Sequence, residues 1–258
     1  ENPKFKDIDG VLFSKSGKTL IQYPASKAGT NYTIPSTTEV VGTAAFYQNK
    51  NITTLTIPSG VDSINPQAFR EMKSLTSVTM PNILNLSNQV FINCNKLVSV
   101  VFPITRMNYI GYGVFSECRS LKSVALPGII TEEFKNNSLF KNCTSLETVI
   151  LPQNTTKIGA FMFFECYALN SVPLNSLPLE VIGSFSFLGT KASLTIPSTV
   201  HTIEEYAFFN NAGTFTFQNI TNLTTIENYV FSNTNKLTTS QKNVITAKNP
   251  NAIGGSIP

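Results

Sequence analysis

The chain has 258 residues, a formal net charge of +4 and only 13% charged side chains, so Asn, Ser and Thr supply most of its polarity. So mild a positive charge is too weak for a nucleic-acid-binding domain. We therefore expect no nucleic-acid partner. No run approaches the roughly 18 apolar residues that a membrane span needs, so we also expect no membrane insertion.

Residues 1–29 are predicted to form an N-terminal cap. Residues 5–24 alternate apolar and polar side chains on both sides of the turn at residues 14–18, which is typical of a β-hairpin. Residues 7–10, Asp-Ile-Asp-Gly, resemble part of a calcium loop, but the remaining ligands and the closing Glu are missing, so we expect no metal there. The chain starts at Glu1 without a Met and without a charged and then apolar leader, so we expect a processed or trimmed form of something longer, in which an export signal is possible but not seen.

Residues 30–240 repeat one pattern at intervals of 21 to 25 residues, as from Phe187 to Phe208 and from Phe115 to Phe140. Nine coils are counted by a column of Phe residues: Phe46, Phe69, Phe91, Phe115, Phe140, Phe163, Phe187, Phe208 and Phe231. An apolar residue stands five positions before most of these Phe residues, and a Pro ends most of the preceding segments. Three columns in phase predict a solenoid in which stacked coils share one core.

Each coil contains a short strand and a return segment. In residues 121–127, Leu-Lys-Ser-Val-Ala-Leu-Pro, Val124 and Leu126 fall on one side of a strand and Ala125 on the other. Pro127 ends the strand because it has no N–H to donate to a parallel ladder. The return segment, Ile-Gly-x-x-Val-Phe at residues 110–115, predicts a tight turn followed by a helical or 3₁₀ turn.

Some coils break the pattern. The apolar register is lost at residues 131–137, where we expect a longer return segment. Two coils, after Phe187 and after Phe208, are shortened, which predicts a change of curvature. Beyond Leu237 the pattern stops, and residues 241–258 are predicted to form a loop or a partial cap.

The repeat Ile-Gly-x-x-(Ala/Val)-Phe-x-x-Cys-x-x-Leu-x-x-Val-x-(Ile/Leu)-Pro closely resembles the BspA-like class of leucine-rich repeats. The resemblance covers about residues 30–240 and implies an α/β right-handed solenoid, with a parallel sheet on one face and short helical, 3₁₀ or loop segments on the other. It also implies a secreted or cell-surface protein, typically bacterial, that is associated with adhesion. It carries no ligand motif that could be transferred to particular residues.

The four cysteines form one structural column, three residues after a repeat Phe: Cys94, Cys118, Cys143 and Cys166. Neighbours in such a column lie about 4.8 Å apart, but their side chains point in parallel, which disfavours disulfides. We interpret them as structural free thiols at a small, semi-buried position; zinc binding or disulfides remain the alternatives.

The outward strand residues are the candidate binding face, which we expect to be a continuous and concave sheet surface. They are Thr54, Thr56, Ser77, Thr79, Ser99, Val101, Ser123, Ala125, Thr148, Ile150, Ser193 and Thr195; Thr214 and Thr216 continue them. Thr is also simply a good exposed strand residue. Val101, Ala125 and Ile150 are the strongest part of the hypothesis, because contiguous exposed apolar residues mark interaction sites.

A basic edge is the second candidate, and it could meet anionic glycans or an acidic protein. It comprises Lys50, Lys73, Lys96, Arg119 and Lys236. Glu71, Glu117 and Glu165 run close by, so a solvated ladder of weak ion pairs is the alternative.

The chain lacks the parts of a catalytic site. His201 is the only histidine, so no histidine triad for a metal exists. The adjacent pairs Glu132-Glu133 and Glu204-Glu205 stand in turns, whereas glycosidase carboxylates come from separate elements. We therefore expect no enzyme and no cofactor, but a monomeric recognition protein that binds an extracellular protein or glycan. The alternatives are a structural spacer and, less favoured, a carbohydrate-active enzyme or an ice-binding surface.

Overall fold

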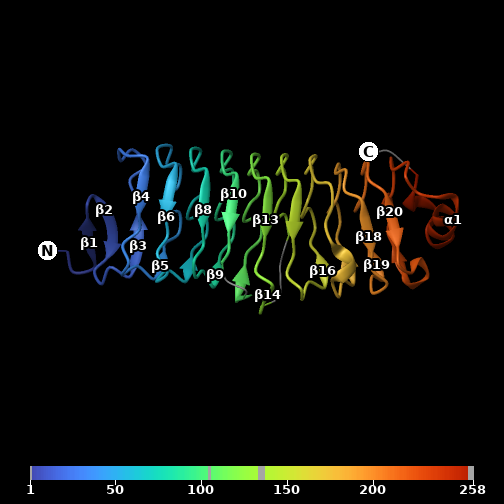
Figure 1. Cartoon of the computed structure of the whole chain (residues 1–258), viewed down its shortest axis with the longest axis horizontal. Coiled ribbons are helices and arrows are strands. Elements are labelled where there is room, and N and C mark those ends of the chain that lie inside the picture. The colour runs from blue at the N-terminus through green and yellow to red at the C-terminus, as the bar shows by residue number, and fades with distance from the viewer. Residues whose placement is uncertain (1, 104–105, 133–136, 255–258) are drawn as a thin grey trace.

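The computed structural model describes residues 2–103, 106–132 and 137–254. Within this part the chain is an elongated α/β solenoid of about nine stacked coils with little helix (Figure 1). Glu133 and most of the irregular stretch at residues 131–137 lie outside the described residues.

The first parallel sheet, which we call the front sheet, collects the predicted strands of successive coils. Its six-stranded part runs in the order β15-β13-β10-β8-β6-β4 and continues, after an interruption, as the pair β18-β20. These strands are β4 (Asn31–Thr33), β6 (Thr54–Thr56), β8 (Ser77–Thr79), β10 (Ser99–Val101), β13 (Ser123–Ala125), β15 (Thr148–Ile150), β18 (Leu194–Ile196) and β20 (Phe215–Phe217). The predicted strand positions are confirmed, and most of the strands end shortly before the repeat Pro.

The front sheet is interrupted at one coil, so its predicted continuity is only partly correct. There Ser171 makes isolated bridges to Thr148 and Ser193 instead of belonging to a strand. Pro173 stands two residues later and cannot donate to a ladder. A 3₁₀ helix, η1 (Leu174–Ser176), follows and turns the chain away.

A second parallel sheet, which the sequence did not predict, lies directly before the return segments, as at Tyr109–Ile110; the predicted tight turns follow it, without the helical or 3₁₀ turn. One part runs β3-β5-β7-β9-β12 and another β16-β17-β19-β21, in one register throughout. The strands are β3 (Thr19–Gln22), β5 (Val40–Val41), β7 (Ser63–Ile64), β9 (Asn85–Leu86), β12 (Tyr109–Ile110), β16 (Lys157–Ile158), β17 (Val181–Ile182), β19 (Thr202–Ile203) and β21 (Thr225–Ile226). Between the two parts, β11 (Arg106–Met107) pairs with β14 (Ile129–Ile130) as a separate ladder.

The rest of the return segment is a chain of tight turns bonded to the next coil. Cys118 N donates to Phe115 O at 3.1 Å within the coil, whereas Phe115 N donates to Leu139 O at 3.0 Å in the following one. A helix cannot form because left-handed residues recur two positions before and after the Phe, as at Gly113 (φ 60°) and Glu117 (φ 62°). Every second backbone N–H is thereby available for pairing between coils.

The Phe column is the core. All nine rings are fully buried, and neighbouring centroids lie 5.1 to 5.7 Å apart. Stacking at this spacing is favourable beyond the area that each ring buries. The central rings of Phe91, Phe115 and Phe140 are stacked with nearly parallel planes, at angles of 7° between neighbours. The solenoid therefore has one continuous aromatic spine.

Both ends of the second sheet are covered. At the N-terminus the predicted hairpin is present, but its first arm is itself a hairpin: β1 (Phe5–Ile8) pairs antiparallel with β2 (Val11–Ser14), which pairs with β3. Residues 9–10 form the turn between β1 and β2, and this turn is the stretch that resembled a calcium loop. Strand β3 then continues in parallel into β5.

At the C-terminus, where the sequence predicts a loop or a partial cap, the chain forms a helix. Helix α1 (Thr239–Lys248) starts with a capping box between Thr238 and Gln241, and it buries Ile245. The Gln241 side chain also donates to Phe215 O at 3.0 Å, which anchors the helix to the last front strand. Two short 3₁₀ helices, η2 (Ile220–Asn222) and η3 (Pro250–Ala252), complete the cap.

Candidate binding face

The outward residues of the front sheet form two parallel rows across nine coils, because side chains alternate along each strand. The first row is Asn31, Thr54, Ser77, Ser99, Ser123, Thr148, Ser171, Ser193 and Thr214. The second row is Thr33, Thr56, Thr79, Val101, Ala125, Ile150, Pro173, Thr195 and Thr216. No charged residue stands in either row, so this face offers hydroxyls, apolar groups and the single amide of Asn31.

The sequence-predicted residues lie on this face with few deviations. Most of them are exposed, whereas Ser99 and Thr195 are half-buried. Thr195 lies beside Thr216 in the second row. The sequence missed β4, whose Asn31 and Thr33 begin both rows.

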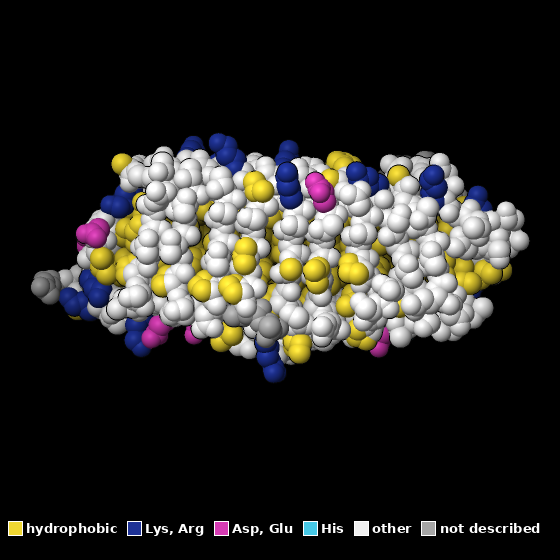
Figure 2. Space-filling view, in the orientation of Figure 1, with side chains coloured by type: hydrophobic (Ala, Val, Ile, Leu, Met, Phe, Trp, Pro, Cys, Tyr) yellow, Lys and Arg dark blue, Asp and Glu magenta, His cyan; other side chains and the backbone are white. Residues whose placement is uncertain are grey.

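Four adjacent members of the second row form what we call the apolar strip: Val101, Ala125, Ile150 and Pro173. Val101 and Ile150 are 50% and 58% exposed, which is more than nearly all other large apolar side chains of the described residues. Figure 2 shows hydrophobic side chains in a line along the middle of the face, while charged side chains gather toward its borders and ends. The strip is thus apolar surface surrounded by hydroxyls.

Pro173 joins the strip although the sequence pattern did not place it there. In the coil of residues 169–174 the Pro stands inside the strand position instead of after it. Only the spacing of the buried Val172 and Leu174 could have placed Pro173 between them, on the outward side.

The basic edge is present but uneven. Lys50, Lys96, Arg119 and Lys236 are exposed and Lys73 is half-buried. Arg119 Nη2 lies 3.0 Å from Glu117 Oε2, an ion pair of the kind expected if the edge is a solvated ladder of weak ion pairs. Thr144 and Tyr167 occupy the equivalent positions in two central coils, so the basic residues are not contiguous.

The cysteine column is fully buried, not semi-buried as predicted, and its four members are free thiols. Each thiol donates to the carbonyl of a Phe in the preceding coil at 3.0 to 3.1 Å, as Cys94 does to Phe69. Burial raises the pKa of Cys94 to about 12 and raises the pKa of the other three as well. At neutral pH these thiols therefore stay protonated and unreactive.

The comparisons with known proteins agree with this geometry. The family model of the BspA type leucine rich repeat region matches residues 25–138 and 134–253, with six copies. The chain belongs to the BspA-type leucine-rich repeat family. No curated protein matches this BspA-type chain.

Two solved structures resemble the BspA-type chain in fold. A leucine-rich repeat protein from Eubacterium ventriosum is 24% identical with a TM-score of 0.51, over 81% of this chain and 50% of that one. A leucine-rich repeat protein from Bacteroides ovatus is 20% identical with a TM-score of 0.53, over 87% of this chain and 58% of that one. The chain therefore spans only about half the length of these relatives.

Neither a metal site nor a membrane span is found in the BspA-type solenoid as far as the structure describes it. Residues 2–103, 106–132 and 137–254 contain no group of three or more His, Cys, Asp or Glu that could hold a metal ion. The helices in these ranges are all too short or too polar to cross a bilayer.

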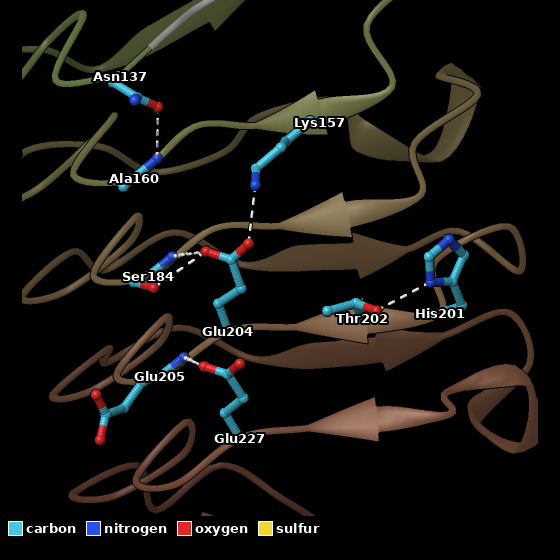
Figure 3. A network of polar contacts seen from close by, with 9 residues as sticks. All are labelled: Asn137, Lys157, Ala160, Ser184, His201, Thr202, Glu204, Glu205 and Glu227. Carbon is cyan, nitrogen blue, oxygen red and sulfur yellow. Dashed lines mark hydrogen bonds and ion pairs between the residues drawn. The ribbon is translucent and has the colours of Figure 1, made fainter.

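A carboxylate network joins neighbouring coils of the BspA-type repeat near the second sheet (Figure 3). Glu204 accepts from Lys157 Nζ at 2.8 Å and from the backbone N–H and the hydroxyl of Ser184, both at 3.0 Å. The backbone N–H of Glu205 is bound in the same way by Glu227 of the next coil. These N–H groups stand three residues before the repeat Phe, where the second sheet has ended.

The position three residues before the repeat Phe also accommodates Pro66, whereas His201 lies elsewhere. Pro66 stands three residues before Phe69. Because Pro has no backbone N–H, this coil has no donor there that needs a carboxylate acceptor. His201, by contrast, is exposed and makes its side-chain contact to the neighbouring Thr202. It takes no part in the Glu204 network, which leaves the network without a shuttle base.

Acid should weaken the solenoid through Glu204. Burial alone would raise its pKa, but the bonds from Lys157 and Ser184 outweigh burial and hold the pKa below the ordinary 4.5. A carboxylate with a lowered folded-state pKa stabilises the fold above its unfolded pKa and loses that contribution as the pH falls through the folded value. We expect Glu204→Gln to lower the free energy of unfolding at pH 7 by about 0.2–1 kcal/mol, the range for a partly exposed pair, and to flatten the decline in stability below about pH 4.5.

The matched control is Glu205→Gln, whose carboxylate points away from the network in Figure 3. Urea unfolding of both variants at pH 7 and at pH 3.5 makes the comparison. Equal pH dependence in the two variants would contradict the assignment to Glu204.

A second aromatic stack lies outside the Phe spine and was missed from the sequence. Phe161, Phe185, Tyr206 and Tyr229 stack at 4.9 to 5.0 Å, and Lys141 covers one end, 5.4 Å from the ring of Phe161. All four aromatic residues have left-handed φ angles of 56° to 59°. They stand two residues before the repeat Phe, so a fourth column was present in the sequence. Three of these rings, those of Phe185, Tyr206 and Tyr229, belong to a small hydrophobic cluster separate from the main core.

Proposed function

We propose that this chain is a non-enzymatic recognition protein, secreted or displayed at a cell surface, that binds an extracellular protein or glycan through the front sheet. Membership of the BspA-type family supports a repeat scaffold for protein interaction. The observation that carries the proposal is the apolar strip, because exposed and contiguous apolar residues in a charge-free face mark an interaction site.

The composition of the two rows favours a protein partner over a glycan. Neither row contains an aromatic ring to stack on a sugar, nor a carboxylate to bind its hydroxyls. Apolar side chains of a partner would instead pack on Val101, Ala125 and Ile150, with Ser and Thr hydroxyls bonding at the rim. Binding of this kind changes little with salt, because no charges are screened.

Replacing Ala125 and Ile150 together with Arg tests the proposal. Two charges that must lose water on contact should weaken binding at least about tenfold, since one unpaired buried charge costs several kcal/mol. The assay is adhesion of the purified array to host cells and to matrix-coated surfaces. Thr216→Arg is the control, because it adds a charge to the same face outside the strip.

A structural spacer is the second candidate, and it is supported by the length of the relatives, of which the chain spans about half. A stiff stack of coils would then hold another domain away from a surface. Unchanged adhesion of the double Arg variant would refute the front-face proposal and favour the spacer.

A further inference from the structure

Strand β4 ends the front sheet with an open edge. It pairs with β6 on one side, and it is the last strand in that sheet's order. The N-terminal strands β1 to β3 do not cover it, because they extend the second sheet through β5. In the described part of the chain, one edge of the solenoid's front sheet thus stays without a strand partner.

This strand carries the tripeptide Asn31-Tyr32-Thr33, an Asn-x-Thr acceptor sequence for N-linked glycans. Asn31 and Thr33 are both exposed, and they point to the same side because strand side chains alternate. Tyr32 points inward, with its ring 4.7 Å from Tyr23 and 5.9 Å from Phe46. The inward anchor therefore fixes the acceptor outward.

Six other acceptor sequences lie in the described residues, at Asn51, Asn85, Asn142, Asn154, Asn219 and Asn222. In each of them the side-chain Nδ2 already donates a hydrogen bond within the fold. Asn154, for example, donates to Ile130 O at 2.7 Å, and Asn142 donates to Glu117 at 2.6 Å. The amide of Asn31 makes no such bond among the described residues, so substituting it disturbs nothing.

We propose that Asn31 is the preferred N-glycan acceptor of this chain when it is exported through a glycosylating secretory pathway. The donor class is an oligosaccharide joined through C1 of its first sugar to a lipid pyrophosphate. The Asn31 Nδ2–C1 bond forms, the bond from C1 to the pyrophosphate oxygen breaks, and the amide loses one proton while the lipid pyrophosphate leaves. No oxidation is involved.

A glycan at Asn31 would hang over the open edge of β4. Bare strand edges invite pairing with other chains, and covering an edge prevents it. The apolar strip begins at Val101, three strands further along the sheet, and would stay accessible. The site therefore lies on the front face but outside the apolar strip.

The test is secretion of the chain, behind a signal peptide, from a eukaryotic cell. Treatment with a peptide N-glycosidase in ¹⁸O water marks each former glycan as a labelled Asp. The tryptic peptide of residues 28–50 contains Asn31 as its only acceptor, so its label is unambiguous. We expect the highest occupancy there, and we expect Thr33→Val to abolish the label without changing the melting temperature.

Thr56→Val is the matched control, since it makes the same change in the next strand outside any acceptor sequence. It should leave the label at Asn31 unchanged. An unlabelled peptide 28–50 from secreted protein would overturn the proposal, whether the other acceptor peptides are labelled or all are bare.

Discussion

Phe115→Ala is expected to lower the free energy of unfolding by about 3–5 kcal/mol, the usual cost of removing a buried aromatic ring. The ring is fully buried and stacks on Phe91 and on Phe140, with both centroids 5.6 Å away. Because coils contact only their neighbours, a void in the middle of the spine weakens the coupling between the two halves. The urea transition, followed by circular dichroism, should move to lower urea and broaden.

The control for this experiment is Tyr112→Ala in the same coil, since the Tyr112 side chain is 46% exposed. Surface substitutions of this kind usually change stability by less than about 0.5 kcal/mol. If Phe115→Ala unfolds at the same urea concentration as Tyr112→Ala, the spine does not hold the array together.

Gly213→Ala should be nearly as damaging, although it adds a single methyl group. A Cβ at this position would overlap the carbonyl of Ala192 in the preceding coil, and that obstacle is backbone, which cannot rotate away. Overpacking typically costs about 1–3 kcal/mol, and a backbone obstacle places this case at the upper end. The melting temperature, measured by calorimetry, should fall by several degrees.

Gly254→Ala provides the comparison, because a Cβ there meets nothing within 4 Å. It should melt like the unmodified chain. If Gly213→Ala melts at the same temperature as the unmodified chain, the coils at Ala192 and Gly213 can move apart without loss of stability. That result would contradict the close packing between these coils.

Much of the fold could be predicted because its strongest constraints repeat. The Phe, apolar and Pro columns located the nine coils and the outward residues of the front sheet, since each column places the same atoms in the same environment. The second sheet was missed because its strands between coils are two residues long, as at β7, which is too short to show an alternating pattern.

The left-handed geometry of the turns and the C-terminal helix were missed for different reasons. Left-handed positions are filled by Gln89, Glu117 and Asn142 as well as by Gly, so the usual glycine signal is absent. Helix α1 buries only Ile245 and is otherwise mostly polar, so its sequence lacks an apolar stripe. Its capping box at Thr238 and Gln241 was the one available signal.

The candidate face was predictable in outline but not in extent. Val101, Ala125 and Ile150 followed from the strand pattern, whereas Pro173 entered the strip through an irregular coil. Hydrophobic spacing locates an outward residue only where the strand is regular.

The uniform register of the second sheet also bears on how such a chain can change length. Val41, Ile64, Leu86 and Ile110 pair in sequence, each with the same partner position in the next coil. A gene that gains or loses one whole repeat unit, such as the 23 residues 46–68, rejoins surfaces that already match. Recombination within the repeats can therefore lengthen the rod while both ends keep their caps. The offset ladder of β11 and β14 is where such an exchange would fail.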